Sequence, residues 1–115
     1  MLPVDIKMVR KIALSLDNAE EATSYGTVAF KVNGKLFARL HQDGESLIVR
    51  MDFDQREDFI ASDPDTFFIT DHYKNYEWLL IRMAKVDVDT LSRLLKISWN
   101  LRRAEKRQPS SSRKK

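Results

Sequence analysis

The fold of this chain is decided by residues 27–52, which have the sequence TVAFKVNGKLFARLHQDGESLIVRMD. Apolar and polar side chains alternate along 27–32, 35–42 and 46–52, which is the period of a strand with one buried face. The doublets Asn33-Gly34 and Asp43-Gly44 separate these runs, and both favour type I′ hairpin turns, in which the two central residues have positive φ. We therefore predict a meander of three antiparallel strands.

One helix is predicted before the meander and another after it. Residues 4–16 place Val9, Ala13 and Leu16 on one stripe, which is typical of an amphipathic helix, and Pro3 suits its first turn. Asp54 is followed three residues later by Glu57, the spacing of a capping box. A short helix is therefore expected from Asp54 to about residue 62, with Tyr25-Gly26 as the entry to the strand region that precedes it.

The remainder of the chain predicts two further strands and a last helix. Residues 66–70 and 77–83 have strand character, and Asp87 can cap a helix that turns Leu91, Leu94 and Leu95 inward. The expected order is helix, three strands, helix, two strands, helix. This order predicts an α+β two-layer sandwich with a largely antiparallel five-stranded sheet.

Length and composition predict one folded domain over residues 1–103. The chain has 115 residues, of which 43% are hydrophobic and 32% charged, values typical of a globular protein. It has no cysteine, which excludes disulfides and thiolate catalysis and fits a reducing cytoplasm. There is no signal-peptide pattern, and no run approaches the ~20 apolar residues of a membrane span. We expect a cytoplasmic protein with no membrane partner.

Positive charge is concentrated at the C-terminus. Residues 102–115 contain seven Lys or Arg and one Glu, whereas residues 1–101 contain 13 Lys or Arg and 16 Asp or Glu. The basic character of the chain therefore comes from its end, not from the folded body. Residues 104–115 are predicted to be a disordered basic tail, either a solvated charge run or an electrostatic arm for phosphates. The candidate tail contacts are Arg102, Arg103, Lys106 and Arg107.

The sequence predicts neither catalysis nor a bound cofactor. It lacks a glycine-rich phosphate loop and a pair of histidines at helical spacing around a glutamate. His41 and His72 lie on different predicted elements, and no further ligand is evident for a metal ion. We therefore expect a protein that is not an enzyme and holds no metal and no cofactor.

Strand alternation places a group of cations and aromatic rings on the sheet face opposite the helices. If that pattern holds, the face presents Lys31, Phe37, Arg39, Arg50, Trp78 and Arg82. The three arginines are expected to converge there, with an aromatic ring or an external anion between them. Such a face could bind nucleic acid, dock a protein partner or form a homodimer.

The segment ITDHYKNYEWLLIR at residues 69–82 and the opening LSLDNAEE at residues 14–21 resemble sequence patterns of the MmcQ/YjbR family of small bacterial proteins. The resemblance covers about residues 12–103 and departs from the family pattern at Asn18 and Asn75. It implies a two-layer fold related in outline to secretion chaperones, and a DNA-binding role. The alternative is a chaperone-like protein-interaction module that uses the same sheet face.

His72 and Tyr73 are the family-motif pair, and the sequence leaves their role open. One interpretation is a structural turn in which the His72 imidazole caps a backbone carbonyl and its ring packs on the core. The other is that the pair belongs to a functional site.

Overall fold

The structure, a computed structural model, describes residues 4–105. The element order is α1 (Ile6–Leu14), β1 (Ala19–Ser24), β2 (Thr27–Val32), β3 (Lys35–Leu40), β4 (Ser46–Arg50), α2 (Phe53–Ser62), β5 (Phe67–Phe68), the 3-10 helix η1 (Asp71–Tyr73), β6 (Trp78–Arg82) and α3 (Val88–Ala104). The six strands form one antiparallel sheet in the order β1-β2-β3-β4-β6-β5. The α+β class and the predicted three-strand meander are confirmed, but the sheet has a sixth strand.

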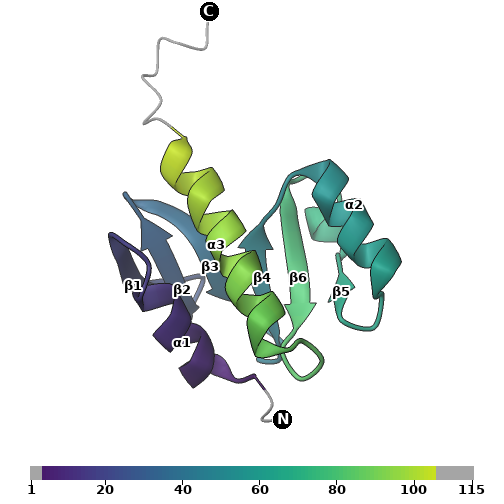
Figure 1. Ribbon diagram of the computed structural model, residues 1–115, viewed down its shortest axis with the longest axis horizontal. Helices are drawn as coiled ribbons and strands as arrows, with labels where there is room; N and C mark the ends of the chain where they lie inside the picture. Colours follow the sequence, from purple (N-terminus) through teal and green to yellow (C-terminus); the bar gives the residue numbers. More distant parts are fainter. Residues whose placement is uncertain (1–3, 106–115) are drawn as a thin grey trace, which may run out of the picture.

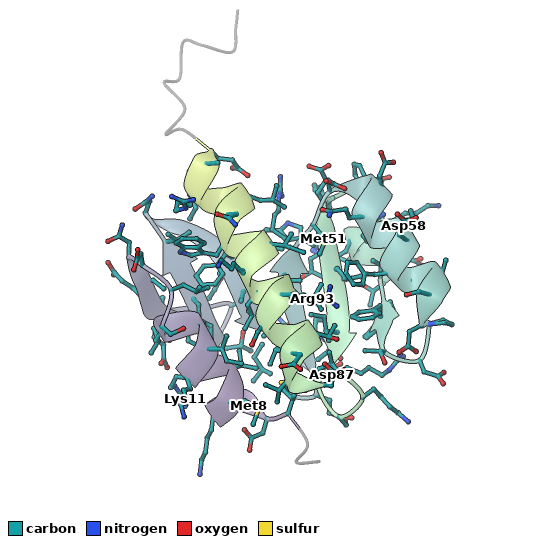
Figure 2. The ribbon with its side chains drawn as sticks, in the orientation of Figure 1. Met8, Lys11, Met51, Asp58, Asp87 and Arg93 are labelled. Carbon is teal, nitrogen blue, oxygen red and sulfur yellow. The ribbon has the colours of Figure 1, made fainter. Side chains whose placement is uncertain are left out.

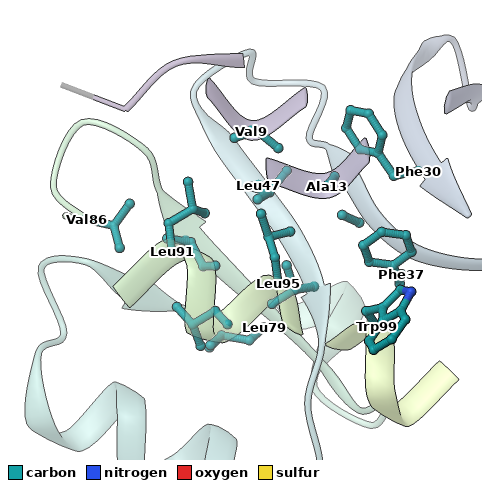
Figure 3. Packing of buried hydrophobic residues seen from close by; sticks show 14 of the residues in the cluster. Val9, Ala13, Phe30, Phe37, Leu47, Leu79, Val86, Leu91, Leu95 and Trp99 are labelled. Carbon is teal, nitrogen blue, oxygen red and sulfur yellow. The ribbon is translucent and has the colours of Figure 1, made fainter. Parts of the chain in front are cut away.

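The helices α1 and α3 cover one face of the sheet, and α2 lies beside β5 at its edge (Figure 1). The hydrophobic core fills the space between α1, α3 and the sheet. Figure 3 shows Val9 and Ala13 of α1, and Leu95 and Trp99 of α3, directed toward the strands. Phe30, Leu47 and Leu79 meet them from the sheet, and these seven residues are all buried. No helix within residues 4–105 combines the length and the apolar character that a bilayer crossing requires.

Each long helix begins at an aspartate that accepts a hydrogen bond from a backbone amide. Asp5, Asp52 and Asp87 cap α1, α2 and α3 by bonds from the amides of Met8, Gln55 and Thr90. The Asp87 cap is confirmed, and Figure 2 shows this residue at the start of α3. The predicted short helix is confirmed as α2, but its predicted cap was wrong, because Asp52 and not Asp54 is the cap. Asp52 and Asp54 carry the same carboxylate, so the residue type does not decide which of them caps the helix. The weak amphipathic pattern of α2 does not fix its first residue, and tertiary packing decides it.

The strand missed by the sequence analysis is β1, and Tyr25-Gly26 is the turn that joins it to β2. Tyr25 has φ 54° and Gly26 has φ 79°, the pair of positive values that a two-residue I′-like turn requires. Tyr25-Gly26 is therefore a hairpin turn and not the entry to the first strand. The β1 sequence AEEATS has few residues with high strand propensity, so its pairing depends on the neighbouring strand.

The two doublets of the meander behave differently. Asn33 and Gly34 both have positive φ, as predicted, whereas in the β3–β4 connection only Gly44 does. There the Asp43 carboxylate accepts bonds from the amides of Glu45 and Ser46 at 2.8 and 2.9 Å and so holds a longer turn.

A β-bulge between β2 and β3 exchanges the faces of two side chains. Phe30 pairs with Ala38 but Lys31 pairs with Leu36, so Phe37 is the extra residue. Phe37 consequently lies in the core, fully buried, and Leu36 turns to the opposite face. The prediction that Phe37 belongs to the cationic face was wrong, because alternation alone does not reveal a bulge.

Ser98 of α3 bridges β3 and β4 next to the last pair of their ladder. Its hydroxyl donates to the Phe37 carbonyl at 2.6 Å and accepts from the Arg50 amide at 2.8 Å. The side chain is fully buried, so it satisfies two backbone groups that would otherwise be left without partners inside the protein. α3 is thereby fixed to both β3 and β4.

Candidate functional site

The candidate site is a cavity of about 610 Å³ on the sheet face that α1 and α3 leave uncovered. Outward side chains of β3, β4 and β6 form its floor, and the segment around η1 forms a wall. It is lined by Tyr25, Leu36, Arg39, His41, Gln42, Ile48, Thr70, His72, Tyr73, Tyr76 and Trp78. The cavity thus brings one predicted arginine and the family-motif pair into a single site.

Arg39 lies in the floor of the cavity and is only 4% exposed. Its Nη2 donates to the Tyr73 hydroxyl at 2.7 Å, and its Nη1 donates to Thr27 Oγ1 at 3.2 Å. Its Cζ lies 5.2 Å from the centroid of the Tyr25 ring, within cation–π range. All these partners are neutral, and no carboxylate within residues 4–105 forms an ion pair with it. A buried cation without a counter-ion carries a desolvation cost of several kcal/mol, on the order found for isolated buried charges.

The wall around η1 is held in place by Arg56 of α2, which is 3% exposed. Its guanidinium donates to the backbone carbonyls of four residues, Tyr73, Lys74, Tyr76 and Trp78, at distances of 2.6 to 3.4 Å. Its Nε also pairs with the exposed Glu57 carboxylate at 3.2 Å. One buried side chain therefore orients the loop that presents His72, Tyr73 and Tyr76 to the cavity.

Tyr25 forms the opposite rim and has two unusual properties. Its side chain is 81% exposed, and its φ of 54° lies in the left-handed region that bulky residues rarely adopt. Backbone strain of this kind is typical of ligand clamps and costs about 1–3 kcal/mol. Tyr76, on the loop side, is also largely exposed, at 59%. Two tyrosine rings are thus available to a ligand.

Trp78 is flanked by two cations. The Cζ atoms of Arg50 and Arg102 lie 5.3 and 5.5 Å from its ring centroid. Arg50 also faces the Glu77 carboxylate at 3.6 Å, and Arg102 donates to the Leu36 carbonyl and to Glu105. Both charges are therefore compensated, and they support the ring from outside the cavity.

The His41 side of the rim carries one carboxylate. His41 Nδ1 lies 3.3 Å from Asp43 Oδ2. Partial burial alone would raise the pKa of Asp43, but bonds from the Glu45 and Ser46 amides, the Ser46 hydroxyl and His41 outweigh it and lower the pKa. Asp43 is thus a carboxylate whose charge is already engaged by the turn.

The predicted convergence of three arginines was wrong. Arg39, Arg50 and Arg82 each contact a different aromatic ring, and Arg82 lies over Phe68 at 4.1 Å, outside the cavity. Arg82 is exposed and donates to the Asp65 carbonyl at 3.0 Å. Their separation follows from pairing, since Arg50 is opposite Trp78 whereas Arg82 is opposite Ser46, at the other end of β6.

Other predicted residues are also placed by the structure. Lys31 is partly buried next to Leu36 but does not line the cavity. Arg103 lies in the last turn of α3, where it contacts the Trp99 ring and Asn100, so Arg102 and Arg103 belong to the helix and not to a free tail. Lys106 and Arg107 lie outside the described residues.

The structural interpretation of His72 was wrong. The side chain is exposed, its ring packs edge-on against Tyr73 at 4.7 Å between centroids, and no bond from its imidazole to a carbonyl occurs within residues 4–105. His72 and His41 both line the cavity, yet the described part of the chain contains no cluster of three His, Asp or Glu side chains that could hold a metal ion.

Sequence reasoning missed Tyr25, Tyr76 and Arg56 as site residues. The Tyr25-Gly26 doublet was an available signal, because a glycine after an aromatic residue can mark a turn, and an aromatic side chain at a turn has no core to enter. Nothing comparable marks Arg56, since its carbonyl partners lie at least 17 residues away along the chain.

Comparisons with known proteins agree with the resemblance found in the sequence. The chain is similar in structure to the Deinococcus radiodurans protein DR2400, which carries the family domain DUF419, with a TM-score of 0.74, 20% sequence identity, and coverage of 85% of this chain and 78% of that one. At this identity the likeness shows the fold alone. No curated protein sequence matches the chain. The YjbR family model matches residues 14–101, which is most of the chain, and the protein therefore belongs to the YjbR family.

Proposed function

We propose that this protein is a nucleic-acid-binding module that takes unpaired bases into the outer cavity of the sheet. One observation carries the proposal: a buried arginine without a carboxylate partner lies among tyrosine, histidine and tryptophan rings. Proteins that bind single strands combine cations for the backbone with aromatic rings on which bases stack, each stack contributing about 1–3 kcal/mol.

The shape of the site favours single strands over duplex. A concave cavity with rings on its rim can receive a base that is splayed out, whereas the bases of a duplex are stacked and present only their edges in the grooves. The described helices offer no basic stripe at the cavity, because the cavity face is formed by strands and the η1 loop. No bond cleavage forms part of the proposed role.

The basic C-terminal residues supply the second component of the proposal. Lys and Arg near phosphates add affinity without sequence choice, and this contribution falls steeply with salt. The cavity should therefore provide the preference for unpaired bases, and the C-terminal residues should provide most of the salt dependence.

The test is fluorescence anisotropy of the full chain with labelled single-stranded and duplex DNA of equal length, at two salt concentrations. We expect tighter binding of the single strand at both salts. The double variant Tyr25→Asn/Tyr76→Ala should lose about tenfold or more of its single-strand affinity while duplex binding stays unchanged. Asparagine tolerates the positive φ of position 25, so the hairpin should persist.

Equal affinity of the wild type for both DNAs, unchanged in the double variant, would show that the cavity takes no part. If no DNA bound but an acidic peptide did, the protein-interaction alternative would replace this proposal.

A further inference from the structure

Arg39 is the buried arginine whose charge is not matched by a carboxylate. Within residues 4–105, the comparably buried Arg56 pairs with Glu57, and the more exposed Arg10, Arg50 and Arg102 also face glutamates. The charge of Arg39 instead meets a hydroxyl of Thr27, a carbonyl of Leu40, the Tyr73 hydroxyl and the face of Tyr25. An anion in the cavity would therefore meet a cation that has no competing counter-ion.

Arg39 also has N–H donors that form no hydrogen bond. A guanidinium carries five N–H groups, and three hydrogen bonds are formed, two from Nη1 and one from Nη2. Nε forms no hydrogen bond. Because every fully buried side-chain nitrogen or oxygen among the described residues does form one, Nε must be accessible to solvent. Nε and Nη2 share one edge of the guanidinium, which is suited to two parallel bonds to a phosphate.

The Tyr73 hydroxyl extends this edge. Because it accepts a bond from Arg39, its own proton remains available to a second acceptor. An anion beside Arg39 could therefore receive a bond from the guanidinium and another from the phenol. The family-motif tyrosine would then contact the anion directly.

The volume of the cavity fits a ligand of the size of one small molecule. A volume of about 610 Å³ lies in the range of sites for one small molecule, about 300–1,000 Å³. Around Arg39 stand the exposed rings of Tyr25 and Tyr76, which can pack on a planar group attached to the anion.

We infer that the cavity binds one nucleoside monophosphate unit, with its phosphate on Arg39 and Tyr73 and its base against the Tyr25 and Tyr76 rings. This inference deepens the proposed function, because it rests on the same cavity and names the unit that is recognised. The unit can come from a free mononucleotide or from one residue of a strand, and both sources present the same chemistry.

The test is isothermal titration of the full chain with AMP, UMP, adenosine and inorganic phosphate, and with a single-stranded oligonucleotide. We expect one site per chain for each mononucleotide. Adenosine and phosphate alone should each bind at least about tenfold more weakly, since each lacks one half of the recognised group.

Variants identify the site. Arg39→Lys keeps the charge but loses the planar edge, and should weaken AMP binding by about tenfold. Tyr73→Phe and Tyr76→Ala should each weaken it, the former only for phosphorylated ligands. Arg82→Gln is the matched control, because it removes an arginine that is stacked on an aromatic ring outside the cavity. It should bind as the wild type does.

Each result has a defined meaning. If the oligonucleotide binds and AMP does not, the inference is wrong while the proposed function stands. If AMP binds and the oligonucleotide does not, the inference stands and the protein is a mononucleotide-binding module. Wild-type affinity of a folded Tyr73→Phe and a folded Tyr76→Ala, checked by circular dichroism, would place the ligand elsewhere and overturn the assignment.

Discussion

The two faces of the sheet differ in what completes them. On the inner face, α1 and α3 bring apolar side chains against Phe30, Leu47 and Leu79, and the buried polar group there, Ser98, has both of its partners within the protein. On the outer face, Arg39 is also buried but its charge has no counter-ion within residues 4–105, and Tyr25 and Tyr76 remain exposed. The chain itself completes the inner face, whereas the outer face keeps a buried cation without a counter-ion beside exposed rings, and our proposal is that a ligand completes it.

The largest expected effect is a loss of unfolding free energy in Phe37→Ala, which tests whether this side chain belongs to the inner face. Phe37 is fully buried at the bulge, and truncating a core phenylalanine costs about 3–5 kcal/mol of unfolding free energy. That is a large share of the roughly 5–15 kcal/mol available to a small domain. Urea denaturation should show the loss. A change below about 1 kcal/mol would mean that Phe37 faces outward, as strand alternation alone predicts.

The second prediction concerns the wall of the cavity. Arg56→Met should leave the carbonyls of the 73–78 segment without their shared donor, and each unsatisfied buried group costs about 1–3 kcal/mol. Ligand binding should be lost along with stability, because the loop carries Tyr73 and Tyr76.

Binding and stability can be separated with a matched variant. Glu57→Gln removes only the exposed partner of Arg56 and should change both quantities little, because exposed ion pairs contribute about 0–1 kcal/mol. If Arg56→Met remained folded and bound ligand as the wild type does, the loop would not need this anchor.

The inner face was largely predictable from the sequence, whereas the outer face was not. Period-two alternation correctly placed Phe30, Leu47 and Leu79, because a buried face imposes a pattern on the residues that make it. Alternation also placed Arg39 on the outer face. It could not show that Arg39 is buried, because the rings that contact its guanidinium come from the β1–β2 turn and from the η1 segment.

The errors in the prediction have physical causes of the same kind. The bulge at Phe37 and the strand β1 depend on pairing between chain segments, which a single sequence does not display. The arginines were expected to share a patch because alternation assigns a face but not a position along a strand. Register decides that position, and it separates Arg50 from Arg82 by the length of β6.

The third prediction tests how the two faces are joined. Ser98→Ala removes the hydroxyl that bridges the Phe37 carbonyl and the Arg50 amide, at a cost of about 1–3 kcal/mol for the groups left unpaired. Because the Arg50 amide loses its acceptor, its hydrogen exchange should accelerate in the variant, at the residue whose guanidinium contacts Trp78 on the outer face. Ser98→Thr, which keeps the hydroxyl, is the control for loss of the bond, and unchanged exchange at Arg50 in Ser98→Ala would argue against the bridge.

The smallest effect is expected from the rim carboxylate, in Asp43→Asn. Asparagine keeps the side-chain oxygen that accepts from the Glu45 and Ser46 amides, so the variant removes the negative charge and the oxygen that accepts from the Ser46 hydroxyl. The pKa of Asp43 is lowered in the folded protein, from a reference value of 3.8. Its charged form therefore stabilises the fold at pH values above about 3.8, and this contribution is lost as the pH falls through the lower folded-state pKa. Wild type should be slightly more stable than Asp43→Asn at neutral pH, and the difference should vanish in acid. Urea midpoints measured across this pH range test the sign, and a stability difference that grew toward low pH would contradict it.

The same variant should bind AMP slightly more tightly at neutral pH, because it removes the carboxylate that contacts His41 at the rim of the cavity.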